Sequence, residues 1–309
     1  MMAGTATGRA MAQADKPVRV ILPMQAGSSV DASVRVITNA LAKALGAQVI
    51  IDNQPGAGGI TGAAQIVRAA PDGQTIGVIS SNHVINPAIY ANVPFDTLKD
   101  ITPITMIGTT PLVLLAHPSL GVSDVKGLVA AAKAKPGAIN YGSSGNGTIL
   151  HLAVEMLMAD TGIKLQHVPY RGAGQFLQDL IAGQIQLGVF GANVAATHIQ
   201  TGALKALGVT TAKRTPLLPE VPTIAEQGAA GYDIEGWFAA VGPKDMKPPE
   251  VARFNAAFRA ALASPEVRDV LIKQGNDVTP TTPEECAKML AADLAKYAAI
   301  VKKAGVKLE

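Results

Sequence analysis

Short runs of β-branched residues alternate with amphipathic helical patterns along most of this chain, and this alternation limits its possible folds more than any other feature. Strands and helices that alternate in this way form mainly parallel sheets with helices on both faces. The pattern begins at Val18 and predicts an α/β fold. The predicted strands are residues 18–22, 48–51, 75–79, 112–116, 165–168, 184–189, 204–209 and 237–241.

The C-terminal part has a different pattern, because no strand is predicted after Pro243 and three helical patterns follow. Ser264 before Pro265 is typical of a helix start, with an N-cap residue and a proline in the first turn. Thr282 and Glu285 have the spacing of a capping box. These signals predict a C-terminal segment made of helices alone.

The length of 309 residues exceeds that of a usual single domain, so we expect two lobes, each with a mostly parallel sheet. No long polar linker separates two halves, which favours lobes joined by crossing strands. We expect residues 15–108 and 231–309 to form the first lobe and residues 109–230 the second, with pivots near Thr109 and Gly231.

The composition is that of a globular chain with few charges, since hydrophobic residues make up 48% and charged residues 16%. The net charge is only +3 and no lysine or arginine run occurs, which argues against nucleic acid or an anionic membrane surface as a partner. Cys286 is the single cysteine, which excludes an internal disulfide, and no spacing of cysteine and histidine predicts a metal site. No apolar run reaches the ~18 residues of a membrane span.

The first fourteen residues carry little pattern of helix or strand. They end in the sequence AMAQA, residues 10–14, which contains two overlapping small-x-small cleavage patterns. We interpret residues 1–14 as the tail of an export signal whose hydrophobic part is missing. The alternative is a linker added by cloning.

Residues 141–148 (YGSSGNGT) form a predicted strand-to-helix junction rich in glycine, hydroxyl and amide groups. Glycines let backbone N–H groups turn inward, and the following helix directs the positive end of its dipole at the loop. No base, metal-ligand set or activated nucleophile lies nearby in the sequence, so the junction favours binding an anion over transforming it. The candidate ligand-binding residues here are Ser143, Ser144, Gly145, Asn146, Gly147 and Thr148.

Three further strand-to-helix junctions are similar to this loop in composition. Ligands of open parallel sheets bind beyond the carboxyl ends of the strands, so we expect these loops to face one cleft. The alternative is that each is an ordinary turn. Their candidate residues are Gln25, Ala26, Gly27, Ser28 and Ser29 after the first predicted strand, Ser80 and Ser81 after the third, and Arg171 after the fifth.

Two ionisable side chains near these loops allow two interpretations each. His151 follows residues 141–148 in the first turn of a predicted helix, where it could donate to a ligand carboxylate or cap a loop. Arg171 could pair with a carboxylate, although a loop arginine is more often a solvated surface charge.

Two enzyme motifs are each incomplete by one residue. Residues 142–146 lack the final glycine of a nucleophile elbow, and residues 56–62 carry Thr61 where a dinucleotide-binding fingerprint has its third glycine. We interpret residues 55–62 as a tight turn that enters a helix, and the sequence predicts no cofactor. An enzyme acting on a carboxylate would need a general base, for which His151 and His83 are the candidates.

Several motifs also occur in a fixed order along the chain. They are PxxAGxxxD from Pro23, NxPGAGG from Asn53, APDG from Ala70, NPxxY from Asn86, YGSxGxGT from Tyr141 and HVPY from His167. This order resembles the Bug receptors, the periplasmic solute-binding proteins of tripartite tricarboxylate transporters. The resemblance implies a two-lobed, type II-like periplasmic-binding-protein fold that closes on a small carboxylate. It also implies a periplasmic location and the membrane subunits of such a transporter as partners, and we expect a monomer.

The resemblance implies that one ligand carboxylate is held by Met24–Ser29 and the other by residues 143–148, with Ser80 and Ser81 at the cleft wall. Met24 therefore joins the candidate residues.

Two departures from the family bear on the ligand. Ser28 stands where a second glycine is common, and Gly191 stands where an aspartate is expected. In receptors that bind amino acids such an aspartate could meet the ligand ammonium, so its absence argues against an amino acid. We expect Gly191 to leave room for a bulkier ligand, count it and Asn193 among the candidate residues, and predict a dicarboxylate with an apolar middle, aliphatic or aromatic. The alternatives are a ligand sensor for a regulatory partner and an enzyme acting on a carboxylate.

Overall fold

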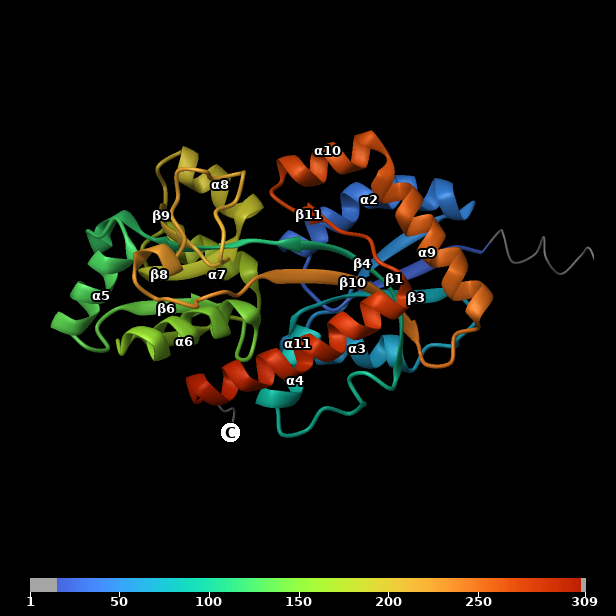
Figure 1. Cartoon of the computed structure of the whole chain (residues 1–309), viewed down its shortest axis with the longest axis horizontal. Helices are drawn as coiled ribbons and strands as arrows, with labels where there is room; N and C mark the ends of the chain where they lie inside the picture. The colour runs from blue at the N-terminus through green and yellow to red at the C-terminus, as the bar shows by residue number, and fades with distance from the viewer. Residues whose placement is uncertain (1–15, 307–309) are drawn as a thin grey trace, which may run out of the picture.

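The computed structural model describes residues 16–306 and shows two α/β lobes side by side, each built around its own β-sheet (Figure 1). The predicted export-signal tail, residues 1–14, lies outside the described residues. Every strand predicted from the sequence is present, with bounds shifted by a few residues. The two-lobed α/β fold is therefore confirmed.

The first lobe contains a six-stranded sheet in the order β11, β4, β10, β3, β1, β2. Strands β1, β2 and β3 run parallel, whereas β10 is antiparallel to both of its neighbours, β3 and β4. The strands are β1 (Val18–Leu22), β2 (Val49–Asn53), β3 (Thr75–Ser80), β4 (Ile101–Thr110), β10 (Gly236–Pro243) and β11 (Asp277–Val278).

The second lobe contains a five-stranded sheet in the order β7, β6, β8, β5, β9. Strand β6 runs parallel to β7 and β8, whereas β5 is antiparallel to β8 and β9. The strands are β5 (Leu112–Ala116), β6 (Asn140–Ser143), β7 (Gln166–Pro169), β8 (Leu187–Gly191) and β9 (Lys205–Val209).

Both sheets are thus mixed, which corrects the expectation of mostly parallel sheets. The long strand β4 carries the chain out of the first sheet and continues through Pro111 into β5, and β10 brings it back. Because these crossing strands run in opposite directions, they pair antiparallel. The prediction that strands end at Pro243 is also wrong, since β11 pairs with Gly108 and Thr109 of β4. A two-residue strand is too short to produce a sequence pattern.

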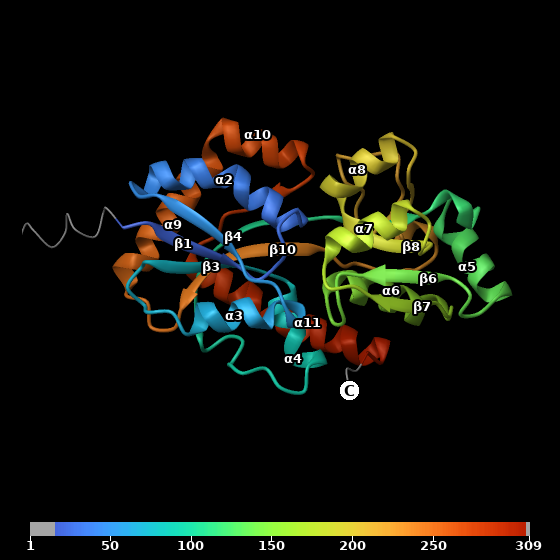
Figure 2. The same cartoon turned by 180° about the vertical axis from the view of Figure 1, so that it is seen from behind.

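Helices cover both faces of each sheet (Figures 1 and 2). In the first lobe α2, α9 and α10 lie on one face, with α3, α4 and α11 on the other; in the second, α7 and α8 lie opposite α5 and α6. The helices are α2 (Ser29–Leu45), α3 (Ile60–Val67), α4 (Asn82–Ile89), α5 (Val125–Ala134), α6 (Ile149–Thr161), α7 (Ala173–Ile181), α8 (Ala192–Gln200), α9 (Pro248–Ala263), α10 (Pro265–Lys273) and α11 (Pro283–Ala304). Short 3₁₀ turns lie at Ala57–Gly59, Pro118–Leu120 and Ala225–Gln227.

The alternation of side chains along the strands divides the first sheet between two cores. Val20 and Leu22 belong to the core under α2 and α9, whereas Ile21 belongs to the core that includes α3, α4 and α11. The second of these cores continues into the other lobe, where it includes Tyr141 and Leu152. The two lobes therefore share buried apolar surface.

The C-terminal helix α11 lies across the boundary of the lobes and packs against both α4 and α6 (Figure 1). The predicted capping box of Thr282 and Glu285 is present at its start. Near its end, Lys303 Nζ lies 2.6 Å from Asp160 Oδ1 of α6. The helix thus ties the second lobe to the first on the side opposite α2 and α10.

Candidate functional site

A cavity of about 760 Å³ lies between the two lobes. Its walls are the loops that follow β1, β2 and β3 in the first lobe and β6, β7 and β8 in the second. Each of these loops leads directly into a helix, so the N-termini of α2, α3, α4, α6, α7 and α8 all face the cavity. This is the position at the carboxyl ends of strands that the sequence indicated.

Helix N-termini, with almost no charged side chains, line the cavity. Among the described residues that line it, Arg171 alone has a charged side chain, and this residue is exposed to solvent. A helix N-terminus carries the equivalent of about half a positive charge together with N–H groups that have no partner in the helix. Six such ends around one cavity favour a small anion over a cation or a neutral molecule.

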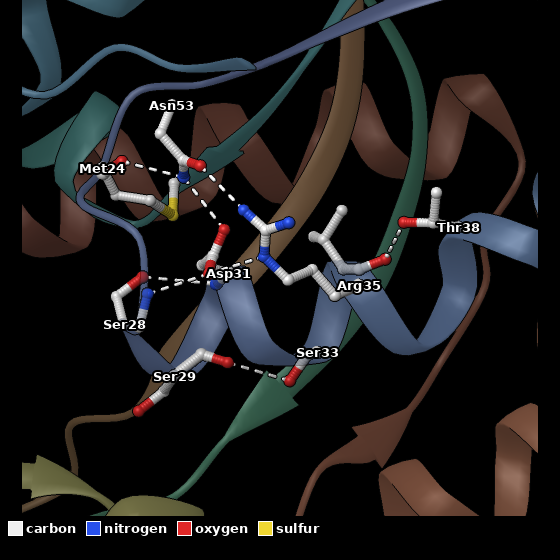
Figure 3. A network of polar contacts seen from close by, with 10 residues as sticks. Met24, Ser28, Ser29, Asp31, Ser33, Arg35, Thr38 and Asn53 are labelled. Atoms are coloured by element: carbon white, nitrogen blue, oxygen red, sulfur yellow. Dashed lines mark hydrogen bonds and ion pairs between the residues drawn. The ribbon is translucent and has the colours of Figure 1, made fainter. Parts of the chain in front are cut away.

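A buried polar network holds the loop between β1 and α2 (Figure 3). Asp31 accepts hydrogen bonds from the backbone N–H of Gly27 at 2.8 Å and from Asn53 Nδ2 at 2.9 Å. It also accepts from Arg35 Nε at 3.0 Å. Burial opposes ionisation of Asp31, but the three donors outweigh it and hold the pKa of its carboxyl below the ordinary value. Asp31 therefore fixes the loop from beneath, without lining the cavity.

We expect Asp31→Ala to lower the free energy of unfolding by about 2 kcal/mol, because it removes a buried carboxylate that accepts hydrogen bonds from Gly27, Asn53 and Arg35. Urea denaturation followed by circular dichroism measures this change. Asp31→Asn keeps one acceptor oxygen and should lose less stability than Asp31→Ala. Equal stability of Asp31→Ala and the wild type would contradict the supporting role.

The first-lobe wall contains a buried hydroxyl without a partner. Ser80 and Ser81 line the cavity where β3 leads into α4. The backbone N–H of Ser81 donates to the carbonyl of Trp237 at 3.2 Å, but its buried side-chain oxygen has no hydrogen-bond partner among the described residues. Burying an unpaired hydroxyl is costly, so a ligand oxygen that meets Ser81 removes this cost.

In the loop between β6 and α6, some predicted residues support the loop and others line the cavity. Ser143 is fully buried, and its hydroxyl donates to the carbonyl of Gly145 at 3.1 Å and lies 2.7 Å from His167 Nε2. The hydroxyl of Thr148 donates to the same carbonyl at 2.9 Å. Ser143 therefore holds the loop in place and does not reach the cavity. The loop residues that line the cavity are Ser144, Gly145, Asn146 and Thr148.

His151 also lies behind the loop. Its Nδ1 accepts from the backbone N–H of Gly147 at 3.2 Å, and its Nε2 lies 3.4 Å from Glu155 Oε1. Its ring stacks on that of His167 with centroids 4.0 Å apart. Burial, and the nearby His151, lower the pKa of His167 to about 4, which keeps the imidazole of His167 neutral at pH 7. Of the two interpretations open from the sequence, the geometry of His151 corresponds to loop capping.

The two lobes touch each other around the cavity. Gln25 Nε2 donates to the carbonyl of Arg171 at 3.2 Å, and the Tyr90 hydroxyl donates to the carbonyl of Asn146 at 3.0 Å. Each bond joins a first-lobe side chain to a second-lobe loop. The two lobes are therefore in direct contact at the rim of the cavity.

Comparison with known proteins identifies the family. The family described as the tripartite tricarboxylate transporter family receptor matches residues 33–306. The chain belongs to this family. BugT from Bordetella pertussis is 30% identical to this receptor over 296 residues, which are 95% of this chain and 91% of BugT. The resemblance to Bug receptors is confirmed.

Solved structures give the same result. The periplasmic binding protein BugD matches this receptor with a TM-score of 0.90 and 29% identity, over 95% of this chain and 99% of BugD. A protein of R. palustris solved with adipate matches with a TM-score of 0.91 and 29% identity, over 95% of this chain and 99% of that one. The two-lobed fold of this receptor is thus that of periplasmic binding proteins.

Gly191 is a point where the lobes of the receptor approach closely. A Cβ atom added at Gly191 would lie 2.4 Å from Ser29 Oγ of the first lobe. The space beside Gly191 is therefore filled by Ser29, which corrects the expectation that this glycine leaves room for a bulkier ligand. Glycine at this position instead permits contact between the lobes.

The cavity of the receptor contains most of the candidate residues from the sequence. Those that line it are Met24, Gln25, Gly27, Ser28, Ser29, Ser80, Ser81, Ser144, Gly145, Asn146, Thr148, Arg171 and Gly191. Those that do not are Ala26, Ser143, Gly147, His151 and Asn193. The side chain of Asn193 instead accepts from the N–H of Val194.

Sequence reasoning missed several lining residues of the receptor. The loop at residues 56–59 was interpreted only as a turn, although it follows β2 as the predicted loops follow β1 and β3. Its position after a parallel strand was the signal that could have identified it. The other missed residues include Asn82, Tyr90, Tyr170, Leu177, Phe190 and Trp237.

Residues 16–306 contain no candidate metal site and no candidate membrane-spanning helix. In this part of the receptor no group of three or more His, Cys, Asp or Glu side chains is placed to hold a metal ion. None of its helices combines the length and hydropathy that crossing a membrane requires.

Proposed function

We propose that this chain is a periplasmic receptor that captures a small carboxylate by lobe closure and delivers it to a tripartite tricarboxylate-type membrane transporter. The observation that carries this proposal is the convergence of six helix N-termini on one cavity whose described lining has no acidic side chain. The family match and the adipate-bound relative support it. We also propose that residues 1–14 are the remainder of an export signal and that the receptor acts as a monomer.

We infer that the ligand is a dicarboxylate with an apolar middle, aliphatic or aromatic. Polar loops from both lobes can each receive one carboxylate, with the loop after β3 on one side and the loop after β6 on the other. The apolar residues Leu112, Leu177 and Phe190 also line the cavity and suit a hydrocarbon body. No described lining carboxylate is available to an ammonium group, which argues against an amino acid.

We propose that the lobes comprise residues 15–108 with 231–309, and residues 109–230. Chain crossings next to Thr109 and Gly231 support pivots at these positions, because β4 ends at Thr110 and Gly231 has a φ of 82°. A ligand that contacts both lobes favours the closed form through its differential affinity.

We propose binding without chemistry. An enzyme would need a general base next to its substrate. The two candidates from the sequence, His83 and His151, are buried, and neither is among the described residues that line the cavity. Each is already engaged, since His83 Nε2 lies 2.8 Å from the carbonyl of Thr97 and His151 caps Gly147.

A thermal-shift screen of protein that has been unfolded, dialysed and refolded tests the function. We expect malate, adipate or terephthalate at 100 times its Kd to raise the free energy of unfolding by about 2.7 kcal/mol. Adipamide is the matched control, because it has the shape of adipate without the charges, and it should give no shift. A larger shift with glutamate or a sugar, and none with any dicarboxylate, would contradict the proposal.

A further inference from the structure

Among the described residues, Asn82 alone combines a cavity position with a side-chain hydrogen bond to a helix of the other lobe. It is the first residue of α4 in the first lobe and is half-buried in the cavity lining. Its Oδ1 accepts a hydrogen bond from the backbone N–H of Ile149 at 2.8 Å. Ile149 is the first residue of α6 in the second lobe.

This bond pairs a backbone N–H group at the N-terminus of α6 that has no acceptor among the described residues of the second lobe. The first N–H groups of a helix have no partner within it, and the N-cap side chain usually accepts from one of them. In α6 the N-cap is Thr148, whose hydroxyl donates to the carbonyl of Gly145 and caps no N–H of the helix. The cap of α6 is therefore supplied by Asn82 from the opposite lobe, and it exists only while the lobes are together.

The chemistry of the carboxamide leaves a donor free. Because the N–H of Ile149 can only donate, the atom of Asn82 that meets it is the oxygen, and the NH₂ group remains. Within the described residues, Asn82 Nδ2 takes part in no hydrogen bond, nor is it a fully buried atom. The neighbouring Ser81 hydroxyl is unpaired as well. Asn82 Nδ2 is thus a free donor on the first-lobe wall of the cavity, and the residue that precedes it in the chain has an unpaired buried hydroxyl.

We propose that Asn82 couples lobe closure to carboxylate binding, with its Oδ1 capping α6 and its Nδ2 donating to the ligand carboxylate. This inference rests on the proposed carboxylate-binding function. A bound carboxylate that accepts from Nδ2 orients the amide so that Oδ1 faces α6, and closure in turn orients Nδ2 for the ligand. An amide is suited to both tasks, whereas an aspartate would cap α6 and repel the anion.

Asn82→Asp and Asn82→Ala separate the two tasks. Asn82→Asp keeps the acceptor for α6 but replaces the donor with a negative charge. We expect ligand-free Asn82→Asp to be as compact as the wild type and to bind adipate at least about 100-fold more weakly. Asn82→Ala loses both groups, so it should bind adipate about 10-fold more weakly and have a larger radius of gyration without ligand.

Small-angle scattering measures the compactness, and the fluorescence of Trp237, the single tryptophan, reports adipate binding at the cavity wall. Asn92→Asp is the matched control, because it makes the same charge change at an exposed residue outside the lining. Urea denaturation shows whether each variant is folded.

The inference is overturned if Asn82→Asp binds adipate as tightly as Asn92→Asp, or if ligand-free Asn82→Asp is as open as Asn82→Ala. These outcomes differ from a failure of the proposed function, in which the wild type itself binds no dicarboxylate. Even then, small-angle scattering of ligand-free Asn82→Asp and Asn82→Ala tests whether the bond from Asn82 to α6 stabilises the closed lobes.

Discussion

Acidification from pH 7 to pH 4 is expected to lower the free energy of unfolding by about 3 kcal/mol, with His83 as the main cause. This side chain is only 5% exposed, its ring stacks on Phe95, and its Nε2 lies 2.8 Å from the carbonyl of Thr97. Burial lowers the pKa of His83 to about 4, whereas the unfolded chain has the ordinary value of 6.5. Between about pH 6.5 and pH 4, His83 binds a proton in the unfolded state but stays neutral in the folded state. The free energy of unfolding therefore falls over this range.

Other groups change the size of this effect in both directions. Burial raises the pKa values of the Glu235 and Asp293 carboxyls, which opposes the loss of stability. His167, whose pKa is also lowered to about 4, adds to the loss over the same range. Asp31 and Glu155 have pKa values below the ordinary ones, because their hydrogen bonds outweigh the opposing effect of burial. Their contributions are present above about pH 4 and are lost on further acidification.

Urea denaturation at pH 7, 5.5 and 4 measures the effect of acid. His83→Gln is the matched variant, because its amide can still donate to the Thr97 carbonyl but does not titrate. We expect a shallower dependence of stability on pH in this variant. A wild type that is equally stable at pH 7 and pH 4 would contradict the argument.

The architecture was predictable because strand and helix patterns are local properties of the sequence. The crossing strand β4 escaped prediction because its sequence, ITPITMIGTT, contains a proline and no regular alternation. Its place is fixed by pairing with β10, which lies more than a hundred residues further along the chain. The antiparallel half of each sheet arises from such pairings, and local patterns do not contain them.

The candidate site was predictable at the level of loops but less so for single side chains. Glycine and serine after a parallel strand indicated the correct loops around β1, β3, β6 and β7. Whether a side chain of such a loop faces the cavity depends on what lies behind it. Ser143 and His151 face a buried group formed with His167, which comes from β7 and has no sequence signal linking it to them.

The role of Gly191 shows a related limit. Its partner, Ser29, lies on the other lobe, so the contact depends on how the lobes meet. The sequence shows that residue 191 is a glycine but does not show which contact requires a glycine there. The structure indicates that Gly191 permits close contact between the lobes, whereas from the sequence alone we attributed this glycine to the size of the ligand.

Gly191→Asp is expected to weaken dicarboxylate binding by more than about 100-fold. The new Cβ would lie 2.4 Å from Ser29 Oγ, which hinders closure. The added carboxylate would also enter a cavity whose described lining has no other negative side chain. Two like charges about 5 Å apart repel by about 3 kcal/mol at an effective dielectric constant of about 20, which corresponds to more than 100-fold in affinity. The backbone of Gly191 has a φ of −59°, so an L-residue there is not strained.

Gly191→Asn is the matched control, because it introduces the same bulk without the charge. We expect Gly191→Asn to lose about 10-fold in affinity for adipate, as hindered closure removes interactions worth about 1.4 kcal/mol. Titration of each variant with adipate, followed by Trp237 fluorescence, measures both effects. Glutamate carries an ammonium group, which would offset the repulsion between the ligand and the new carboxylate of Gly191→Asp. If the ligand lies between the lobes, the difference in affinity between Gly191→Asp and Gly191→Asn should therefore be smaller for glutamate than for adipate. Equal affinity of both variants for adipate would mean that no ligand carboxylate approaches Gly191, and would place the bound anion elsewhere in the cavity.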